Sequence, residues 1–141
     1  LGEEVSRTRA YLEILKIRMG ERLQVQIELP EALNNVPFPS MMLQTLVENS
    51  INHGLEPKTD GGTIWISARK DQTDDGEIMT VTVADDGNGF GSGTSGTGIG
   101  LKNVRERLKL AYAGAASFSI IANFPNGVAA SITVPVKGPA A

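Results

Sequence analysis

A run of acidic, asparagine and glycine residues lies just past the middle of the chain. It begins Asp85-Asp86-Gly87-Asn88-Gly89 and ends Gly96-Thr97-Gly98-Ile99-Gly100-Leu101, with further glycines between. Glycine permits positive φ and lets the backbone approach a ligand closely. Backbone N–H groups at the start of a helix, together with the helix dipole, attract phosphate. The run therefore indicates a phosphate-binding loop in preference to a flexible linker.

Asp85 stands at the end of an apolar strand predicted over residues 78–84. A carboxylate in that place can accept a hydrogen bond from an exocyclic amine such as adenine N6. Two other phosphate motifs do not apply. No Gly-Lys-Ser or Gly-Lys-Thr occurs, which excludes a P-loop. Residues 91–96 match the dinucleotide pattern by letter, but no βαβ unit surrounds them and no acidic residue follows about 20 positions on.

The second candidate site lies on a helix predicted over residues 40–53, with Ser40 as its cap. One face is apolar. The other carries amide, carboxylate and imidazole groups and no lysine: Thr45, Glu48, Asn49, Asn52 and His53. The amide oxygen of Asn49 suits Mg²⁺, which takes one or two protein oxygens and completes its shell with phosphates and water. The alternatives are a solvated polar face for the helix and a surface role for His53.

The elements that must hold these residues follow from periodicity and from Gly and Pro breaks. Strands are predicted over residues 23–29, 63–70, 78–84, 117–122 and 128–136, and a third helix over residues 99–113. Strands and helices do not alternate strictly, which argues against a doubly wound parallel sheet. We expect an α+β two-layer sandwich, with a mixed, largely antiparallel sheet and helices on one face.

Residues 1–23 read as one helix, whose end Gly20 disturbs. Apolar residues and one threonine repeat at spacings of four and three: Leu1, Val5, Thr8, Leu12, Leu15 and Met19. This heptad seam fits either an amphipathic helix packed on its own domain or one half of a dimerising helical hairpin. We assign residues 1–23 to such a hairpin, residues 24–137 to a catalytic domain and residues 138–141 to a disordered tail.

Composition narrows the class of protein. The 141 residues suit one domain, and 13 basic against 16 acidic residues give a net charge of −3 with no basic patch for nucleic acid. The chain has no cysteine and one histidine, which disfavours a structural zinc site. No stretch reaches the roughly 20 apolar residues of a membrane span.

Three motifs in order resemble those of one ATP-binding family. Residues 46–54 look like the N box of histidine kinases, residues 85–89 like the G1 box and residues 96–101 like the G2 box. These boxes occur in the gyrase, HSP90, histidine kinase and MutL superfamily, whose domains have the Bergerat-type ATP-binding fold. Residues 11–18 and 100–108 are most similar to the LytS-type branch of sensor kinases.

The resemblance implies roles by position. Asn49 would coordinate the Mg²⁺ that bridges the ATP phosphates, with Glu48 beside it as a second catalytic residue, while Asp85 would bind adenine N6. Residues 90–95 would form the ATP lid. The remaining nucleotide-binding positions implied are Asn52, His53, Gly87, Gly89, Gly96, Thr97, Gly98, Ile99, Gly100, Leu101 and Thr133.

Two departures bear on the reaction. Hydrolytic relatives place a glutamate where this chain has Thr45, and threonine is a poor general base. This favours transfer of the γ-phosphoryl group to a protein over hydrolysis. Asn52 also replaces a lysine frequent in histidine kinases. His53 is the only histidine and falls in the N box, so the phosphoacceptor histidine is expected upstream of Leu1.

The resemblance implies a protein-histidine kinase of a two-component signal transduction system. Its partners would be the phosphoacceptor helix of its own homodimer and a response regulator, with no nucleic acid. The domain would be cytoplasmic and the parent protein membrane-anchored. The alternatives are an ATPase of the same superfamily, a nucleotide-binding scaffold without kinase activity, and a serine kinase of the same fold, which the heptad helix disfavours.

Overall fold

The computed structural model describes residues 1–39, 41–51, 61–87, 95–122 and 127–138, with the backbone alone for residues 95–102 and 122. A five-stranded sheet forms one layer, in the order β1-β2-β3-β5-β4. Its strands are β1 (Leu23–Glu28), β2 (Gly62–Thr73), β3 (Gly76–Asp85), β4 (Ser117–Ala122) and β5 (Val128–Pro135). Only β1 and β2 pair in parallel; the other three pairings are antiparallel. The expected mixed, largely antiparallel sheet is confirmed.

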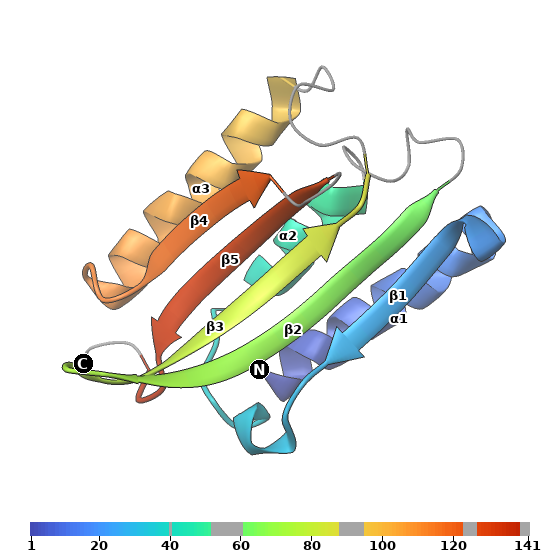
Figure 1. Cartoon of the computed structure of the whole chain (residues 1–141). Coiled ribbons are helices and arrows are strands. Elements are labelled where there is room, and N and C mark those ends of the chain that lie inside the picture. Colours follow the sequence, from blue (N-terminus) through green and yellow to red (C-terminus); the bar gives the residue numbers. More distant parts are fainter. Residues whose placement is uncertain (40, 52–60, 88–94, 123–126, 139–141) are drawn as a thin grey trace.

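Three helices form the second layer: α1 (Gly2–Met19), α2 (Met42–Ser50) and α3 (Ser95–Tyr112). Figure 1 shows all three behind the same face of the sheet. Short 3-10 turns, Gly20–Arg22 and Glu31–Leu33, follow α1 and β1. Alternate strand residues, such as Ile64 and Ile66 of β2 and Val81 and Val83 of β3, point into the space between the layers and form the core. The two-layer sandwich is therefore the observed fold.

All six residues of the predicted heptad seam are buried on the inner side of α1. The apolar ones belong to the core of this domain, and α1 packs against α2 and β1. This is the first of the two interpretations, an amphipathic helix on its own domain. The outer side of α1 leaves Ile14 68% and Ile17 86% exposed. Any pairing of α1 with a further helix would have to use that side, so the hairpin assignment stays a proposal.

Several predicted element bounds were wrong. The turn expected over residues 71–77 is tight, because β2 and β3 stay paired out to Thr73 and Gly76. α3 begins at Ser95 and not at residue 99, since helix propensity is a weak prior that context overrides even at glycines. Gly138, predicted to start a disordered tail, is buried and donates its N–H to the Pro135 carbonyl oxygen at 3.0 Å. Residues 139–141 lie outside the described part.

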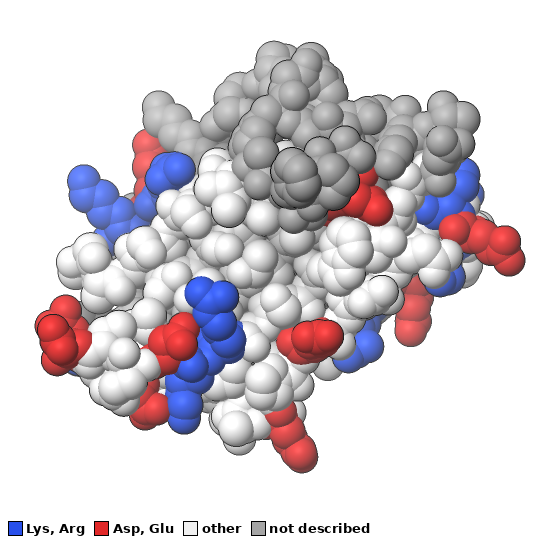
Figure 2. All heavy atoms as spheres, viewed as in Figure 1, with Lys and Arg blue, Asp and Glu red and all other residues white. Residues whose placement is uncertain are grey.

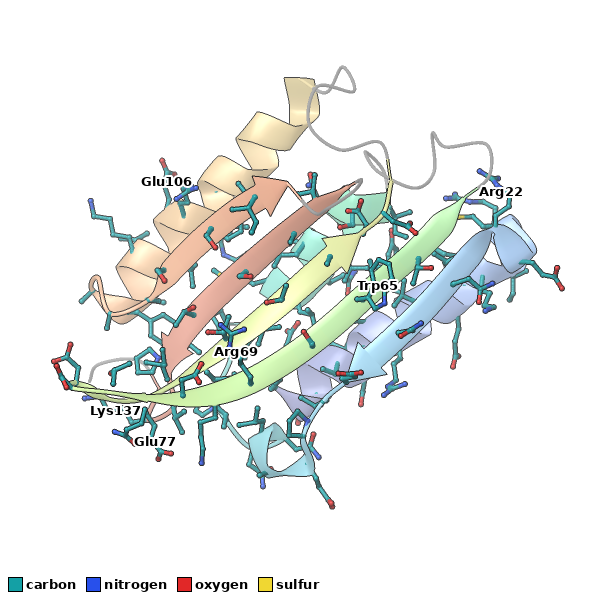
Figure 3. All side chains as sticks on the ribbon, viewed as in Figure 1. Arg22, Trp65, Arg69, Glu77, Glu106 and Lys137 are labelled. Atoms are coloured by element: carbon teal, nitrogen blue, oxygen red, sulfur yellow. The ribbon has the colours of Figure 1, made fainter. Side chains whose placement is uncertain are left out.

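None of the helices in the described residues lies on the other face of the sheet (Figure 1). Hydroxyl groups pair across its strands: Thr80 with Thr133 at 3.1 Å between their Oγ1 atoms, and Thr82 Oγ1 with Ser131 Oγ at 2.9 Å. Figure 2 shows mostly uncharged atoms over this face, and Figure 3 shows Trp65 on it. Among the described helices, none is long and apolar enough to cross a membrane.

Candidate functional site

The site is built around Asp85, the last residue of β3, which is 1% exposed. Its Oδ1 accepts the N–H of Gly87 at 2.9 Å, so the chain turns sharply as it leaves the strand. The hydroxyl of Ser50, at the end of α2, and the N–H of Val128, at the start of β5, also donate to this carboxylate. Three elements therefore meet on one side chain.

The electrostatics of Asp85 follow from this setting. Burial raises the pKa of the carboxyl above its ordinary value of 3.8, because water no longer stabilises the charge. The hydrogen bonds from Gly87, Ser50 and Val128 oppose that shift, while the nearby charge of Asp86 adds to it. A buried carboxylate that already accepts from three fixed donors is a preorganised acceptor for one further polar hydrogen. That is what recognition of an amine requires.

Asp86 has a different task from its neighbour. Its Oδ1 accepts the N–H of Thr63 at 2.8 Å, and its own N–H donates to the Thr63 carbonyl oxygen at 3.3 Å. This two-way contact ties the end of β3 to the start of β2. Asp86 thereby fixes the backbone that holds Asp85, and its side chain is committed to structure.

Gly127 lies directly against the backbone of Asp85. Its φ is +100°, and a Cβ placed there would overlap the Asp85 carbonyl oxygen and lie 2.9 Å from Oδ1. Only glycine combines that backbone conformation with such close approach. The start of β5 can therefore reach the carboxylate, which explains how the N–H of Val128 comes to donate to it.

α2 carries the metal candidate. Asn49 is half-buried and immediately precedes Ser50, so its side chain projects from the helix turn that contacts Asp85. Within the described part of the chain its amide makes no hydrogen bond. Glu48 Oε1 accepts Gln44 Nε2 at 3.0 Å. Thr45 Oγ1 donates to the Met41 carbonyl oxygen at 2.8 Å, a contact that occupies the hydroxyl hydrogen.

The donor set fits magnesium with phosphate better than a metal held by protein alone. Among the described residues, no three His, Cys, Asp or Glu side chains are grouped to hold a metal ion. Mg²⁺ retains waters and takes few protein oxygens when phosphates supply the rest. Asn49 offers one amide oxygen for such an ion.

Several predicted residues lie outside what can be described. Asn52, His53 and Gly89 belong to segments that the structure does not describe. For the G2-box run only the backbone is given: Gly96, Thr97 and Gly98 fall in the first turn of α3, and Ile99, Gly100 and Leu101 follow within the helix. The N–H groups of Ser95, Gly96 and Thr97 have no partner within an α-helix that begins at Ser95, which keeps them available to an anion.

Thr133 does not join the site. Its neighbours Ile132 and Val134 are fully buried in the core, so alternation along β5 turns Thr133 to the opposite face of the sheet. There it pairs with Thr80, away from the side that Asp85 faces. The predicted contact with the adenine side would need a side chain on the inner face. The part of β5 that reaches Asp85 is its other end, through the backbone of Val128.

Ser50 and Gly127 are site residues that sequence reasoning missed. Ser50 lies on the apolar face of the helix predicted over residues 40–53, beside Leu43, Leu46 and Val47, and a lone hydroxyl facing the core is itself a signal. Gly127 directly precedes the strand predicted over residues 128–136, where its residue type indicates only a turn. Its close approach to Asp85 depends on two strands that are distant in sequence, so no local pattern shows it.

The family model for histidine kinase-, DNA gyrase B- and HSP90-like ATPases matches residues 34–138. The sensor histidine kinase BtsS of Escherichia coli (strain K12) is 30% identical over 120 residues, covering 85% of this chain and 21% of BtsS. The sensor protein LytS of Oceanobacillus iheyensis is 36% identical over 90 residues, covering 64% of this chain and 15% of LytS. The chain thus spans about a fifth or less of these relatives.

Among solved structures, the catalytic domain of histidine kinase ThkA superposes with a TM-score of 0.70 at 17% identity. The match covers 99% of this chain and 95% of that domain. Coverage this complete on both sides means that the two chains share one fold over nearly their whole length. The expected resemblance to the LytS-type branch is confirmed by these similarities.

Proposed function

We propose a function from the premise that this chain belongs to the family of histidine kinase-, DNA gyrase B- and HSP90-like ATPases. It is the ATP-binding catalytic domain of a sensor histidine kinase, which passes the γ-phosphoryl group of ATP to a histidine outside these 141 residues. The observation that carries the proposal is that α2, β3 and β5 meet on the buried Asp85 carboxylate. The contact from α2 is made by Ser50, the residue next to Asn49.

Adenine is the base that this carboxylate suits. Gly87, Ser50 and Val128 already donate to it, so the remaining acceptor capacity is directed and cannot turn away. Adenine N6 is a donor, whereas guanine has a carbonyl oxygen at the matching position, which an ionised carboxylate repels. The base preference follows from charge and from geometry held in place before binding.

The phosphates would lie between Asn49 and the start of α3. Mg²⁺ held by Asn49 supplies charge neutralisation on the phosphate oxygens when bound. The unpaired N–H groups at the start of α3, up to Thr97, would contact the phosphates from the other side. Phosphoryl transfer to a protein depends mainly on such positioning and charge stabilisation, so no general base that activates water is required.

Transfer to a protein is favoured over hydrolysis, because the two residues that could activate water, Thr45 and Glu48, are held by other contacts. The hydroxyl hydrogen of Thr45 is committed to the Met41 carbonyl oxygen, and threonine does not act as a base near neutral pH. Glu48 is held by Gln44 on the same helix. Glu48 therefore has at most a supporting role, and an ATPase machine is the weaker candidate.

The rest of the proposal concerns the whole protein. Relatives of this kind are sensor histidine kinases several times longer than this chain. A phosphoacceptor helix in a homodimer, a response regulator and a membrane anchor on the parent protein follow from that relationship. Residues 1–23 would connect the catalytic domain to that helix, with the domain boundary near residue 23.

Calorimetric titration with a non-hydrolysable ATP analogue, with and without Mg²⁺, tests binding. Steady-state hydrolysis of ATP by the same chain separates the two activities. We expect magnesium-dependent binding with hydrolysis no faster than the buffer background. Sustained turnover of ATP by the chain alone would favour the ATPase reading, and absence of any binding would refute both.

A further inference from the structure

The start of α2 is held by a side chain from α1. Glu4 Oε1 accepts the backbone N–H of Met41 at 2.6 Å, across 37 residues of sequence. Glu4 is only 5% exposed, although it is a carboxylate on the first turn of an otherwise amphipathic helix. Arg7 lies on the same side, with Nη1 3.4 Å from Oε1. Burial of a carboxylate is costly unless hydrogen bonds or charges compensate it, so the contacts of Glu4 need an explanation.

Among the described residues α2 has no side-chain cap of its own, and Ser40, the predicted cap, lies outside them. Its N-cap residue is Met41, which has no side-chain acceptor and stands in the left-handed region at φ 67°. A helix start leaves backbone N–H groups unpaired and carries partial positive charge, both of which a carboxylate satisfies. Glu4 therefore pairs the N–H of the N-cap residue, which in a capping box is done by a glutamate or glutamine of the same helix.

The helix capped in this way is the one that carries the nucleotide site. α2 is nine residues long, and Asn49 and Ser50 lie at its other end, about two turns from Met41. A short, rigid helix transmits a shift of its start to its end. Ser50 donates to Asp85, so a displaced α2 would disturb the adenine acceptor as well as the metal amide.

We propose that Glu4 is a positioning residue: by capping α2 from α1, it makes the geometry of the nucleotide site depend on the seating of α1. The proposal rests on the nucleotide-binding function proposed above. It goes further in giving the N-terminal helix a direct structural path to Asn49. Movement of α1 that withdraws Glu4 would leave the Met41 N–H unpaired and loosen the site.

The contact also has a feature that packing alone does not explain. Glu4 Oε2 and Thr8 Oγ1, one helical turn apart on α1, are both buried without a hydrogen-bond partner among the described residues. Unpaired buried polar atoms are costly. An apolar residue at position 4 would remove part of that cost, so a role in packing predicts that such a residue is tolerated. A capping role predicts the opposite for binding.

Three variants separate reach, charge and volume. Glu4→Gln keeps an oxygen at the same distance without the charge, Glu4→Asp keeps the charge but shortens the reach, and Glu4→Leu keeps the volume without an acceptor. Glu3→Gln is the matched control, because the Glu3 side chain is 93% exposed on the same helix turn. Should Glu4→Leu fail to fold, Glu4→Asp against Glu4→Gln still decides the point.

Titration with Mg²⁺ and a non-hydrolysable ATP analogue is one measurement. We expect Glu4→Leu and Glu4→Asp to weaken binding about fivefold, which corresponds to the usual loss of helix stability when an N-cap is removed, because binding must then restore the start of α2. Glu4→Gln and Glu3→Gln should stay within about twofold of the parent. Affinity in Glu4→Leu and Glu4→Asp equal to that of the parent would overturn the proposal.

Amide hydrogen exchange at Met41 without nucleotide is the second measurement. We expect fast exchange in Glu4→Leu and Glu4→Asp and slow exchange in the parent and in Glu4→Gln. Equally slow exchange in all four proteins contradicts the cap. If the parent shows the protected amide but binds no nucleotide, the proposed function fails while the cap itself stands.

Discussion

Ser50 of α2 donates its hydroxyl hydrogen bond to the carboxylate of Asp85 at the end of β3. Both residues are buried, at 7% and 1% exposed. This contact joins the helix that presents the metal amide to the strand that presents the base acceptor. A substitution that displaces either α2 or the end of β3 should therefore affect both the metal amide and the base acceptor of the proposed nucleotide site.

Ser50→Ala should weaken binding of an ATP analogue about tenfold or more, because a lost hydrogen bond to a charged group costs about 1.5–3 kcal/mol. Calorimetric titration measures it. Ser131→Ala is the matched control, since it removes a hydroxyl pair with Thr82 on the opposite sheet face. We expect that control to leave affinity unchanged. Equal losses in both variants would mean that the effect is global.

Asp85→Asn should reduce affinity for the ATP analogue by about 100-fold or more, because it replaces an anionic acceptor by a neutral amide and can present N–H groups to adenine N6. The same variant should be more stable than the parent without nucleotide at neutral pH. The raised pKa of Asp85 means that burial penalises its charged form in the folded protein.

The pH dependence has a definite sign. Because the pKa of Asp85 is higher in the folded state, the folded protein binds the proton more readily than the unfolded chain. The contribution of Asp85 to the free energy of unfolding is therefore greatest below 3.8, falls as pH rises through the folded pKa, and stays low above it. In urea unfolding, the advantage of Asp85→Asn should grow over that window. An advantage that shrinks as pH rises would contradict the assignment.

Gly127→Ala should destabilise the fold by about 2 kcal/mol more than Gly76→Ala. Both glycines have positive φ, +100° and +119°, so both variants carry backbone strain. A Cβ at position 76 meets nothing within 4 Å, whereas at position 127 it meets the Asp85 backbone. Backbone cannot yield like a side chain, and overpacking costs about 1–3 kcal/mol. Urea midpoints of the two variants give the difference, and similar midpoints would count against the close approach.

Asn49→Ala should remove the magnesium-dependent part of binding while leaving the magnesium-free part. The ratio of affinities with Mg²⁺ and with EDTA reports it, and should approach one in the variant. Gln44→Ala, on the same helix but paired with Glu48, is the control. A ratio in Asn49→Ala equal to that of the parent would mean that another residue holds the metal.

Much of this arrangement could be predicted from the sequence, for physical reasons that differ by residue. Asp85 follows a strand of alternating apolar residues, so its place at the end of β3 could be predicted from local pattern. The same alternation on β5 placed Thr133 on the outer face, because Ile132 and Val134 must be inside. The predicted contact of Thr133 with the adenine side is wrong because residues along a strand alternate between faces, and Thr133 falls on the face opposite to Ile132 and Val134.

The contacts that complete the site depend on distant segments. Glu4 meets Met41 across 37 residues, and neither side chain type suggests the other. Gly127 approaches Asp85 only because β3 and β5 pair. The seam of α1 was visible as a heptad pattern, but spacing alone does not say whether a helix packs on its own domain or on another helix.

The most direct test of the central claim compares adenine and guanine nucleotides on the unmodified chain. Calorimetric titrations with non-hydrolysable ATP and GTP analogues, both with Mg²⁺, share every phosphate and metal contact and differ at the base that Asp85 faces. We predict binding of the ATP analogue at least about 100-fold tighter than that of the GTP analogue. Equal affinities, or binding of neither, would contradict the account of Asp85 as the adenine acceptor.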